Sequence, residues 1–488
     1  MKYSISIFFV LGILTTYSQS TFFTHFPKPG FEKGCDAAET SDNSLIIAGY
    51  TDPDNLYIYN GCLLKLSSEG ELLKESILVR ENQSILLIKI LGIPNNDQQF
   101  LCIGSSDSVF NTHIKNKLIF NIIDTTLQIL DSCFYHTELD KILQPQAIDL
   151  WNDSILFLLN GYSSNPFNGI QLGVVKIKLP FDSIASVFFE SIYEYFPQDI
   201  LWVDSKVKVF YMFGPPVGNG LANMLELDEN LNYLGSKPAP EGICSSLASE
   251  YKNDTCYILT GTWDDPFGPQ TIRTYLMDLN DDTIQSLLFP RHNDTILYGG
   301  GCTNTVFNGN EIFVAGVLNL IPSQFPYQQS SSWIQVSRIS NDFSLLSQTY
   351  YGGDAFYYPF SIIPTQDGGA FLTGYRYDYT MPENDLDIFA LKVDSFGLVT
   401  NIPEDASWQM NDAILCPNPG FEYGIAIVGA QHPQATLFLY DLNGRLVMER
   451  PLNQHQTRIQ TTSLPTGTYI YTFVAYEKVI GTGKWVKQ

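Results

Sequence analysis

Short apolar runs that end in glycine recur along the first 402 residues at nearly constant spacing. Each run mixes β-branched, aliphatic and aromatic residues, a composition typical of β-strands. The spacing between successive glycines stays between 47 and 58 residues. The seven glycines are Gly49, Gly104, Gly161, Gly214, Gly261, Gly316 and Gly374. Such a period predicts a repeated structural unit of about 50 residues.

A polar turn precedes each apolar run, and a second hairpin follows it. Asp42-Asn43-Ser44 and Asp367-Gly368-Gly369 are two of these turns, and Asn, Asp and Gly tolerate the positive φ that tight hairpins need. Residues 62–78 and 388–400 each hold two apolar segments joined by a polar turn. The repeated unit is therefore predicted to contain four antiparallel strands, with a longer loop between the second strand and the third.

Seven units of this kind predict an all-β fold with a seven-bladed β-propeller over residues 21–402. A single four-stranded sheet cannot cover both of its faces, whereas sheets packed in a ring cover one another. Two stacked sandwich domains are the alternative. The unbroken spacing favours a ring.

The pattern changes after residue 402. Residues 403–415 are typical of a linker. Alternating strands of five to seven residues follow, with Asn443-Gly444 as a hairpin turn. Residues 416–488 are therefore predicted to form a small Ig-like β-sandwich.

The seventh repeat resembles a repeat that is common in exported bacterial propeller proteins. It contains "TQDGG" (365–369), an apolar strand with glycine, and "LKVDSFG" (391–397). The first repeat matches this pattern loosely, and repeats two to six diverge from it. The resemblance implies the fold and no particular reaction.

The C-terminal segment resembles the type A sorting domain of type IX secretion cargo. The matching segments occur in order, although Cys416 stands where that family commonly has an aromatic residue. The matching residues are Pro417, Asn418, Pro419, Leu439, Tyr440, Asp441, Asn443, Gly444, Leu464, Pro465, Gly467, Tyr469, Gly483 and Lys484. The resemblance implies that the type IX secretion machinery and its sortase are partners. An accessory sandwich that binds a ligand is the alternative.

The first 20 residues, "MKYSISIFFVLGILTTYSQS", contain a lysine, a short apolar run and then small residues. This order is typical of a signal peptide, with cleavage after Ser18 or Ser20. A buried first strand is the alternative. No later stretch is apolar enough for a transmembrane helix. We therefore expect a mature protein that has no transmembrane segment and is secreted or held at the outer cell surface.

Charge and cysteine content narrow the choice of partners. There are 51 Asp and Glu residues against 27 Lys and Arg, a net charge of −24, which repels phosphate backbones, so no nucleic acid is expected. The eight cysteines lack zinc-ligand spacing and suit isolated disulfides or buried thiols. No cofactor is expected. The acidity serves solubility or, alternatively, structural Ca²⁺ sites in the loops.

No sequence motif of a known catalytic centre is present, because HExxH, GxSxG and P-loop patterns are all missing. A Ser-His-Asp arrangement assembled in space stays open. The best candidates are carboxylates and aromatic residues in the loops between second and third strands, since these loops meet at one end of a propeller. The predicted binding residues are Asp52, Asp54, Tyr162, Trp263, Asp264, Asp265, Tyr375, Tyr377 and Asp385.

Two functions follow from these candidates. Exposed rings would form a recognition surface for an extracellular glycan or protein. Paired carboxylates could instead act as acid and base in a glycan hydrolase or lyase, or simply be solvated loop residues. We expect a secreted or cell-surface binding protein, with the enzyme as the alternative. A structural role in the envelope or in gliding adhesion stays open.

Overall fold

The computed structural model describes most of the chain. Among the described residues every regular element is a β-strand apart from one 3-10 turn, η1 (Pro322–Gln324), so the predicted all-β class is confirmed. The predicted signal peptide lies almost entirely outside the described residues. These residues are 19–53, 58–80, 83–108, 117–135, 142–152, 155–163, 171–179, 181, 183–189, 194–214, 221–264, 270–290, 297–301, 303–381, 385–399, 413–416, 423–428, 434–442, 444–452, 456–476 and 478–487.

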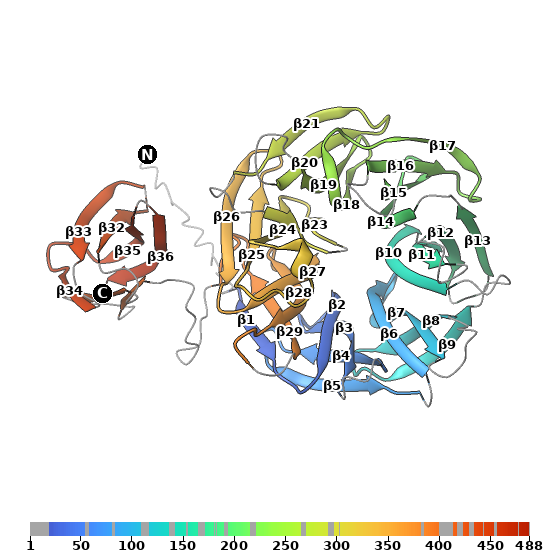
Figure 1. Ribbon diagram of the computed structural model, residues 1–488, viewed down its shortest axis with the longest axis horizontal. Coiled ribbons are helices and arrows are strands. Elements are labelled where there is room, and N and C mark those ends of the chain that lie inside the picture. Colours follow the sequence, from blue (N-terminus) through green and yellow to red (C-terminus); the bar gives the residue numbers. More distant parts are fainter. Residues whose placement is uncertain are drawn as a thin grey trace, which may run out of the picture.

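Most of the sheets follow one another around a ring (Figure 1). In each four-stranded sheet of the ring the first strand lies innermost and the fourth outermost, and neighbouring strands pair antiparallel. The first two sheets are β6 (Gln83–Ile93), β7 (Asn96–Ser108), β8 (Lys117–Asp124) and β9 (Ile129–Tyr135), then β10 (Ile142–Asn152), β11 (Ile155–Ser163), β12 (Gln171–Lys178) and β13 (Ser183–Phe189). The next two are β14 (Glu194–Val203), β15 (Lys206–Gly214), β16 (Leu221–Leu227) and β17 (Tyr233–Pro238), then β18 (Ile243–Asn253), β19 (Cys256–Trp263), β20 (Thr271–Asp278) and β21 (Thr283–Leu288).

A five-stranded sheet and an eight-stranded sheet complete the ring. The five-stranded sheet consists of β22 (Leu297–Gly299), β23 (Thr305–Phe307), β24 (Ile312–Leu318), β25 (Trp333–Ile339) and β26 (Leu345–Gly352). The eight-stranded sheet consists of β1 (Phe22–Phe26), β2 (Phe31–Glu39), β3 (Leu45–Asp52), β4 (Asn60–Leu66), β5 (Leu72–Leu78), β27 (Phe356–Pro364), β28 (Ala370–Tyr377) and β29 (Leu386–Val393).

The eight-stranded sheet joins the two ends of the ring. Strand β1 pairs antiparallel with β29 along five residue pairs, from Phe22 opposite Lys392 to Phe26 opposite Ile388. Strand β2 meets β29 through one parallel pair only, Phe31 with Leu386. An N-terminal strand therefore serves as the outer strand of the sheet formed by the last part of the ring, which closes the ring by hydrogen bonds rather than by a covalent link.

Neighbouring sheets pack face to face. One core cluster joins Phe157 and Val174 of the β10–β13 sheet to Val209 of the next sheet. The following cluster joins Phe210 of that sheet to Tyr257 of the β18–β21 sheet. Each sheet thus has apolar side chains buried on both faces, which explains why the strands contain almost continuous apolar runs.

Six of the seven repeat glycines lie inside the second strand of their unit, although the sequence predicted that each ends its apolar run; only Gly214 ends its strand, β15. At Gly49 and Gly374 the neighbouring innermost strand carries a bulge directly opposite. A Cβ atom at Gly49 would lie 1.9 Å from the Lys33 carbonyl oxygen, and one at Gly374 would lie 2.1 Å from the Tyr358 carbonyl oxygen. Glycine recurs there because the bulge leaves no room for a side chain.

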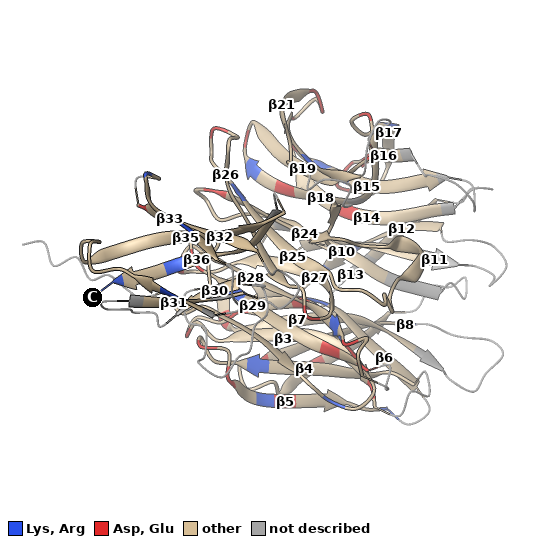
Figure 2. Cartoon of the chain, turned by 60° about the vertical axis from the view of Figure 1, so that its left-hand side comes forward, with Lys and Arg blue, Asp and Glu red and all other residues tan. Residues whose placement is uncertain are grey.

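An aspartate begins many of the turns between the third and fourth strands. The Asp228 carboxylate accepts hydrogen bonds from the backbone N–H groups of Asn230 and Asn232, both at 2.8 Å. Asp124, Asp278 and Asp394 do the same in their turns. Figure 2 shows acidic positions at the tips of several hairpins, including the one that leads into β21. Part of the negative charge therefore serves turn formation.

Two further sheets form a separate body at the C-terminal end of the chain. One consists of β30 (Ala413–Cys416), β31 (Tyr423–Val428) and β34 (Gln456–Gln460), and the other of β32 (Ala435–Asp441), β33 (Leu446–Leu452), β35 (Gly467–Ala475) and β36 (Lys478–Lys487). They share one apolar core, in which Leu415 and Ile459 of the first sheet meet Phe473 and Trp485 of the second. Strand β30 includes residues that the sequence pattern placed in a linker.

Candidate functional site

An extensive group of aromatic side chains lies where the loops after second strands meet, over β27, β28 and the segment 319–332. Phe325 and Tyr327 on this segment are exposed, at 44% and 37% of their surface. The Phe325 ring packs against Tyr358, with centroids 5.0 Å apart, and Tyr358 packs against Phe360 at 5.1 Å. We call Phe325, Tyr327, Tyr358 and Phe360 the aromatic platform.

The segment that carries Phe325 and Tyr327 is held in place by a fully buried glutamine. The Gln328 amide oxygen accepts a hydrogen bond from the Ile321 N–H at 2.6 Å, and its amide nitrogen donates to the Asn319 carbonyl at 2.7 Å. The Asn319 amide in turn donates to the Ser331 carbonyl at 2.7 Å. These bonds cross-link the two ends of the loop, so the exposed rings sit on a preorganised support.

Tyr375 and Tyr377, which the sequence predicted as binding residues, lie beneath this platform. They are only 1% and 2% exposed, which agrees with the alternative that such rings pack down as part of the core. The Tyr375 hydroxyl donates to the Pro326 carbonyl at 3.4 Å, and Gln329 donates to the Tyr377 hydroxyl at 3.0 Å. Both rings lie in strand β28, where packing against the loop segment buries them.

The aromatic group continues onto the first strands of the ring. Phe31 stacks on Tyr50 with centroids 5.9 Å apart, and Tyr59 contacts both rings edge-on. The Lys33 ammonium lies 3.6 Å from the centroid of the Phe360 ring, within the range of a cation–π interaction. The platform therefore combines exposed rings with a positive charge at its edge.

The predicted carboxylates near this platform hold the chain together. Asp52 is buried. The Asp385 carboxylate accepts a hydrogen bond from the Gly30 N–H at 3.0 Å, and Asp387 accepts one from the Lys28 N–H at 3.3 Å. Burial raises the pKa of Asp387 to about 6 despite these bonds and the nearby Arg376. Asp385 and Asp387 thus fix the segment between β1 and β2. Asp54 lies outside the described residues.

Trp263 and Asp264 lie on a different sheet, at the end of β19, so the structure does not join them to the platform. The Asp264 N–H donates to the Gly242 carbonyl at 2.8 Å, and the Arg273 guanidinium lies 5.4 Å from the Trp263 ring. Asp265 lies outside the described residues, as does the side chain of Tyr162 on β11.

A polar network on the innermost strands was not predicted. The Lys89 ammonium on β6 donates to the Thr303 hydroxyl at 2.9 Å and lies 4.0 Å from the Asp36 carboxylate on β2. Ser361 on β27 donates to the same carboxylate at 2.6 Å. Four inner segments are thus connected across the centre of the ring. A lone Lys in an apolar strand at 85–91 was the available sequence signal.

Inner-strand carboxylates also bond to the next sheet around the ring. Asp149 on β10 accepts the Trp202 N–H of β14, and Asp199 on β14 accepts the N–H and hydroxyl of Ser249 on β18. Burial raises the pKa of Asp149 to about 7 and that of Asp199 to about 6. Burial and the charges of both aspartates raise the pKa of Glu250 well above its usual value. Asp149 and Asp199 thus join neighbouring sheets by hydrogen bonds, and we call them the inter-sheet staples.

In the described part of the chain, no three His, Cys, Asp or Glu side chains lie close enough to hold a metal ion together. Nor does that part contain a helix with the length and hydrophobicity needed to span a membrane. Cys62 and Cys102 are buried thiols, and burial raises the pKa of each, as is typical of structural cysteines.

The C-terminal body belongs to a known class of export signal. Residues 416–488 match the family described as the secretion system C-terminal sorting domain, which confirms the predicted type IX sorting domain. In it, the Asp441 carboxylate accepts the Arg445 N–H at 2.9 Å and Gly444 adopts a φ of 75°. Pro417, Asn418, Pro419 and Asn443 lie outside the described residues. The tail marks the chain for export to the outer surface or beyond.

Solved structures with a similar arrangement are distant. The β-propeller domain of the Trilobed protease from Pyrococcus furiosus is 8% identical with a TM-score of 0.40, over 79% of this chain and all of that one. The phage phi92 endosialidase is 10% identical with a TM-score of 0.44, over 96% and 79%. A puromycin hydrolase mutant is 9% identical with a TM-score of 0.47, over 82% and 58%. No match is found among curated proteins.

Proposed function

We propose that residues 21–402 form a seven-bladed β-propeller and that residues 416–488 form an Ig-like sandwich that carries the sorting signal. The single pair between Phe31 and Leu386 supports counting the eight-stranded sheet as two blades, β2–β5 and β27–β29 with β1. Residues 1–20 are then a signal peptide and 403–415 a linker. The type IX machinery and its sortase handle the tail, and the protein is secreted or held at the cell surface.

The propeller binds an extracellular glycan or protein ligand through the aromatic platform. The observation that carries this proposal is the exposure of Phe325 and Tyr327 on a loop that buried hydrogen bonds hold rigid. Rigid rings give a large contact area at a low cost in conformational entropy. The supporting hydrogen bonds lower the cost further, because the loop is ordered before the ligand arrives.

The test is a glycan array and a cross-linking pull-down with the exported chain and a Phe325→Ala/Tyr327→Ala variant. We expect the variant to lose at least tenfold in affinity, about 1.4 kcal/mol. The matched control is Tyr233→Ala/Phe396→Ala, which removes two rings exposed elsewhere, at 56% and 63%. Equal binding by the platform variant and wild type would contradict the proposed surface.

A glycan hydrolase or lyase is the second candidate. Asp387, whose pKa burial raises to about 6 beside Asp385, could hold a proton near neutral pH as a general acid does. However, both carboxylates accept backbone N–H bonds from the segment before β2, which supports a structural role for them. Release of reducing ends from a bound polysaccharide, lost in Asp387→Asn but kept in Asp204→Asn, would favour the enzyme.

A further inference from the structure

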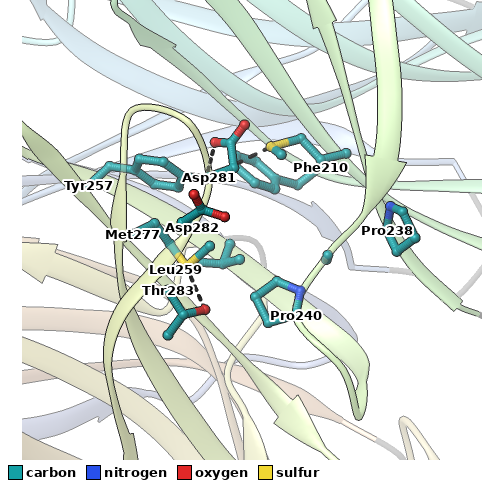
Figure 3. Close-up of a pocket in the computed structure, with 11 residues that line it drawn as sticks. Phe210, Pro238, Pro240, Tyr257, Leu259, Met277, Asp281, Asp282 and Thr283 are labelled. Atoms are coloured by element: carbon teal, nitrogen blue, oxygen red, sulfur yellow. Dashed lines mark hydrogen bonds between the residues drawn. The ribbon is translucent and has the colours of Figure 1, made fainter.

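A cavity of about 220 Å³ lies between the β14–β17 sheet and the β18–β21 sheet (Figure 3). Its apolar wall is formed by the buried side chains of Phe210, Met224, Leu259 and Met277. Pockets for drug-sized ligands measure roughly 300–1,000 Å³, so this cavity suits a group the size of one side chain. The other lining residues are Pro238, Ala239, Pro240, Tyr257, Asp281, Asp282 and Thr283.

The positive charges next to the cavity are already paired. Lys208 is fully buried and donates to Asp281 at 2.6 Å and to Glu226 at 2.7 Å. Lys237 lies 2.6 Å from the second oxygen of Asp281, and the Tyr257 hydroxyl donates to its first oxygen at 2.6 Å. Burial alone would raise the pKa of Asp281, but these hydrogen bonds outweigh it and hold the pKa below its usual value. Neither lysine is therefore available to an anionic ligand.

Asp282 is the remaining charge at the cavity. Asp282 is exposed, and its backbone N–H donates a hydrogen bond to the Asp278 carboxylate at 2.8 Å. Across the described part of the chain, its carboxylate has no hydrogen bond or ion pair with another residue. Figure 3 shows it on the hairpin between β20 and β21, facing the segment that carries Pro238 and Pro240. The cavity thus has one wall of apolar side chains and a negative charge at its edge.

We propose that this cavity binds a primary alkylammonium group. The methylene chain lies against Phe210, Met224 and Met277, and the ammonium donates to the Asp282 carboxylate. A charge-assisted hydrogen bond of this kind is about twice as strong as one between neutral groups. The net charge of −24 raises the local concentration of cations. The site is separate from the aromatic platform and does not depend on it.

The test measures the affinity of the full exported chain for three probes of equal chain length by NMR titration. Hexylammonium should bind at least fivefold more tightly than 1-hexanol or hexanoate. Asp282→Asn should remove that preference for the cation and leave the affinity for 1-hexanol unchanged. Glu229→Gln, which removes an exposed carboxylate from the neighbouring hairpin outside the cavity, should behave as wild type. Nα-acetyl-lysine methylamide, run in parallel, shows whether a peptide lysine supplies the group as well as a free amine does.

A second variant tests the cavity itself. Ala239 is half-buried at the edge of the cavity, and Ala239→Phe should place a ring over it and abolish hexylammonium binding. A circular dichroism melt unchanged from wild type confirms that the variant is folded. The proposal is overturned if no probe binds, if hexylammonium and 1-hexanol bind equally to wild type, or if Asp282→Asn keeps the full preference for the cation.

Discussion

Single turn residues decide how each hairpin closes. In the turns that begin at Asp394 and Asp441, the residue three positions later has a left-handed backbone. Its φ is 72° at Gly397 and 75° at Gly444. Leu127, Leu231 and Phe343 occupy the same place with φ between 62° and 65° and bury their side chains. A non-glycine residue there is strained, so burial of the apolar side chain compensates for the strain. The motif D-x-x-G in the seventh repeat thus has a conformational cause.

Replacement of Gly397 by alanine should destabilise the ring by about 1 kcal/mol, because alanine disfavours a positive φ. The new Cβ would also lie 3.0 Å from Arg338 Cδ. Urea unfolding of wild type and variant measures the change. Gly235→Ala is the control, since a Cβ there meets nothing within 4 Å. Equal loss in both variants would show that the turn conformation is not the cause.

At the scale of elements, the glycine period predicted the strands because it reflects a backbone contact. The bulge opposite Gly49 and Gly374 recurs in other units. Gly104 stands opposite it in the second unit, whereas Asn160 does so in the third. In the fourth unit Tyr211 stands opposite the bulge, and the glycine counted from the sequence, Gly214, lies three residues further on. The inter-sheet staples could not be predicted in this way, because they join residues about fifty positions apart without a fixed residue type.

Asp199 gives the staples a pH dependence that can be measured. Burial raises its pKa from 3.8 to about 6, although Lys89 and the Ser249 bonds act in the opposite direction. The folded state therefore holds the proton more tightly than the unfolded state, and stability is lost as pH rises from 4 towards 7. Asp199→Asn cannot ionise. The free energy of unfolding of wild type minus that of the variant should fall by about 2 kcal/mol over this range.

Urea titrations at pH 4, 5.5 and 7 check this expectation. Asp204→Asn, at an exposed turn position with a φ of 52° that asparagine also adopts, should show no such change relative to wild type. A difference between wild type and Asp199→Asn that stays constant with pH would mean that the carboxylate is already ionised in the folded state across the range.

At the scale of the whole molecule, the candidate site shows where sequence reasoning stops. Tyr375, Tyr377 and Asp385 lie near the aromatic platform, and a role for them in ligand binding stays a prediction. Which rings remain exposed could not be predicted, because exposure depends on how the segment 319–332 folds over β28. That fold rests on Gln328, whose hydrogen bonds to its own loop have no periodic signature. Chain-wide repeats are visible in a sequence, whereas the local fold of one long loop is not.

The ring and the C-terminal body have separate cores, so each should unfold as its own cooperative unit. Phe23 on β1 is 8% exposed and packs on Tyr351, Tyr357 and Phe389, which makes it part of the closure of the ring. Trp485 is fully buried in the C-terminal body. Phe23→Ala and Trp485→Ala should each cost about 3–5 kcal/mol of stability, but in different units.

Calorimetry should show two unfolding transitions. Phe23→Ala should lower the midpoint temperature of one transition and Trp485→Ala that of the other. A single transition that both variants lower equally would mean that the two bodies fold as one, and the sorting tail would then report on the state of the ring during export.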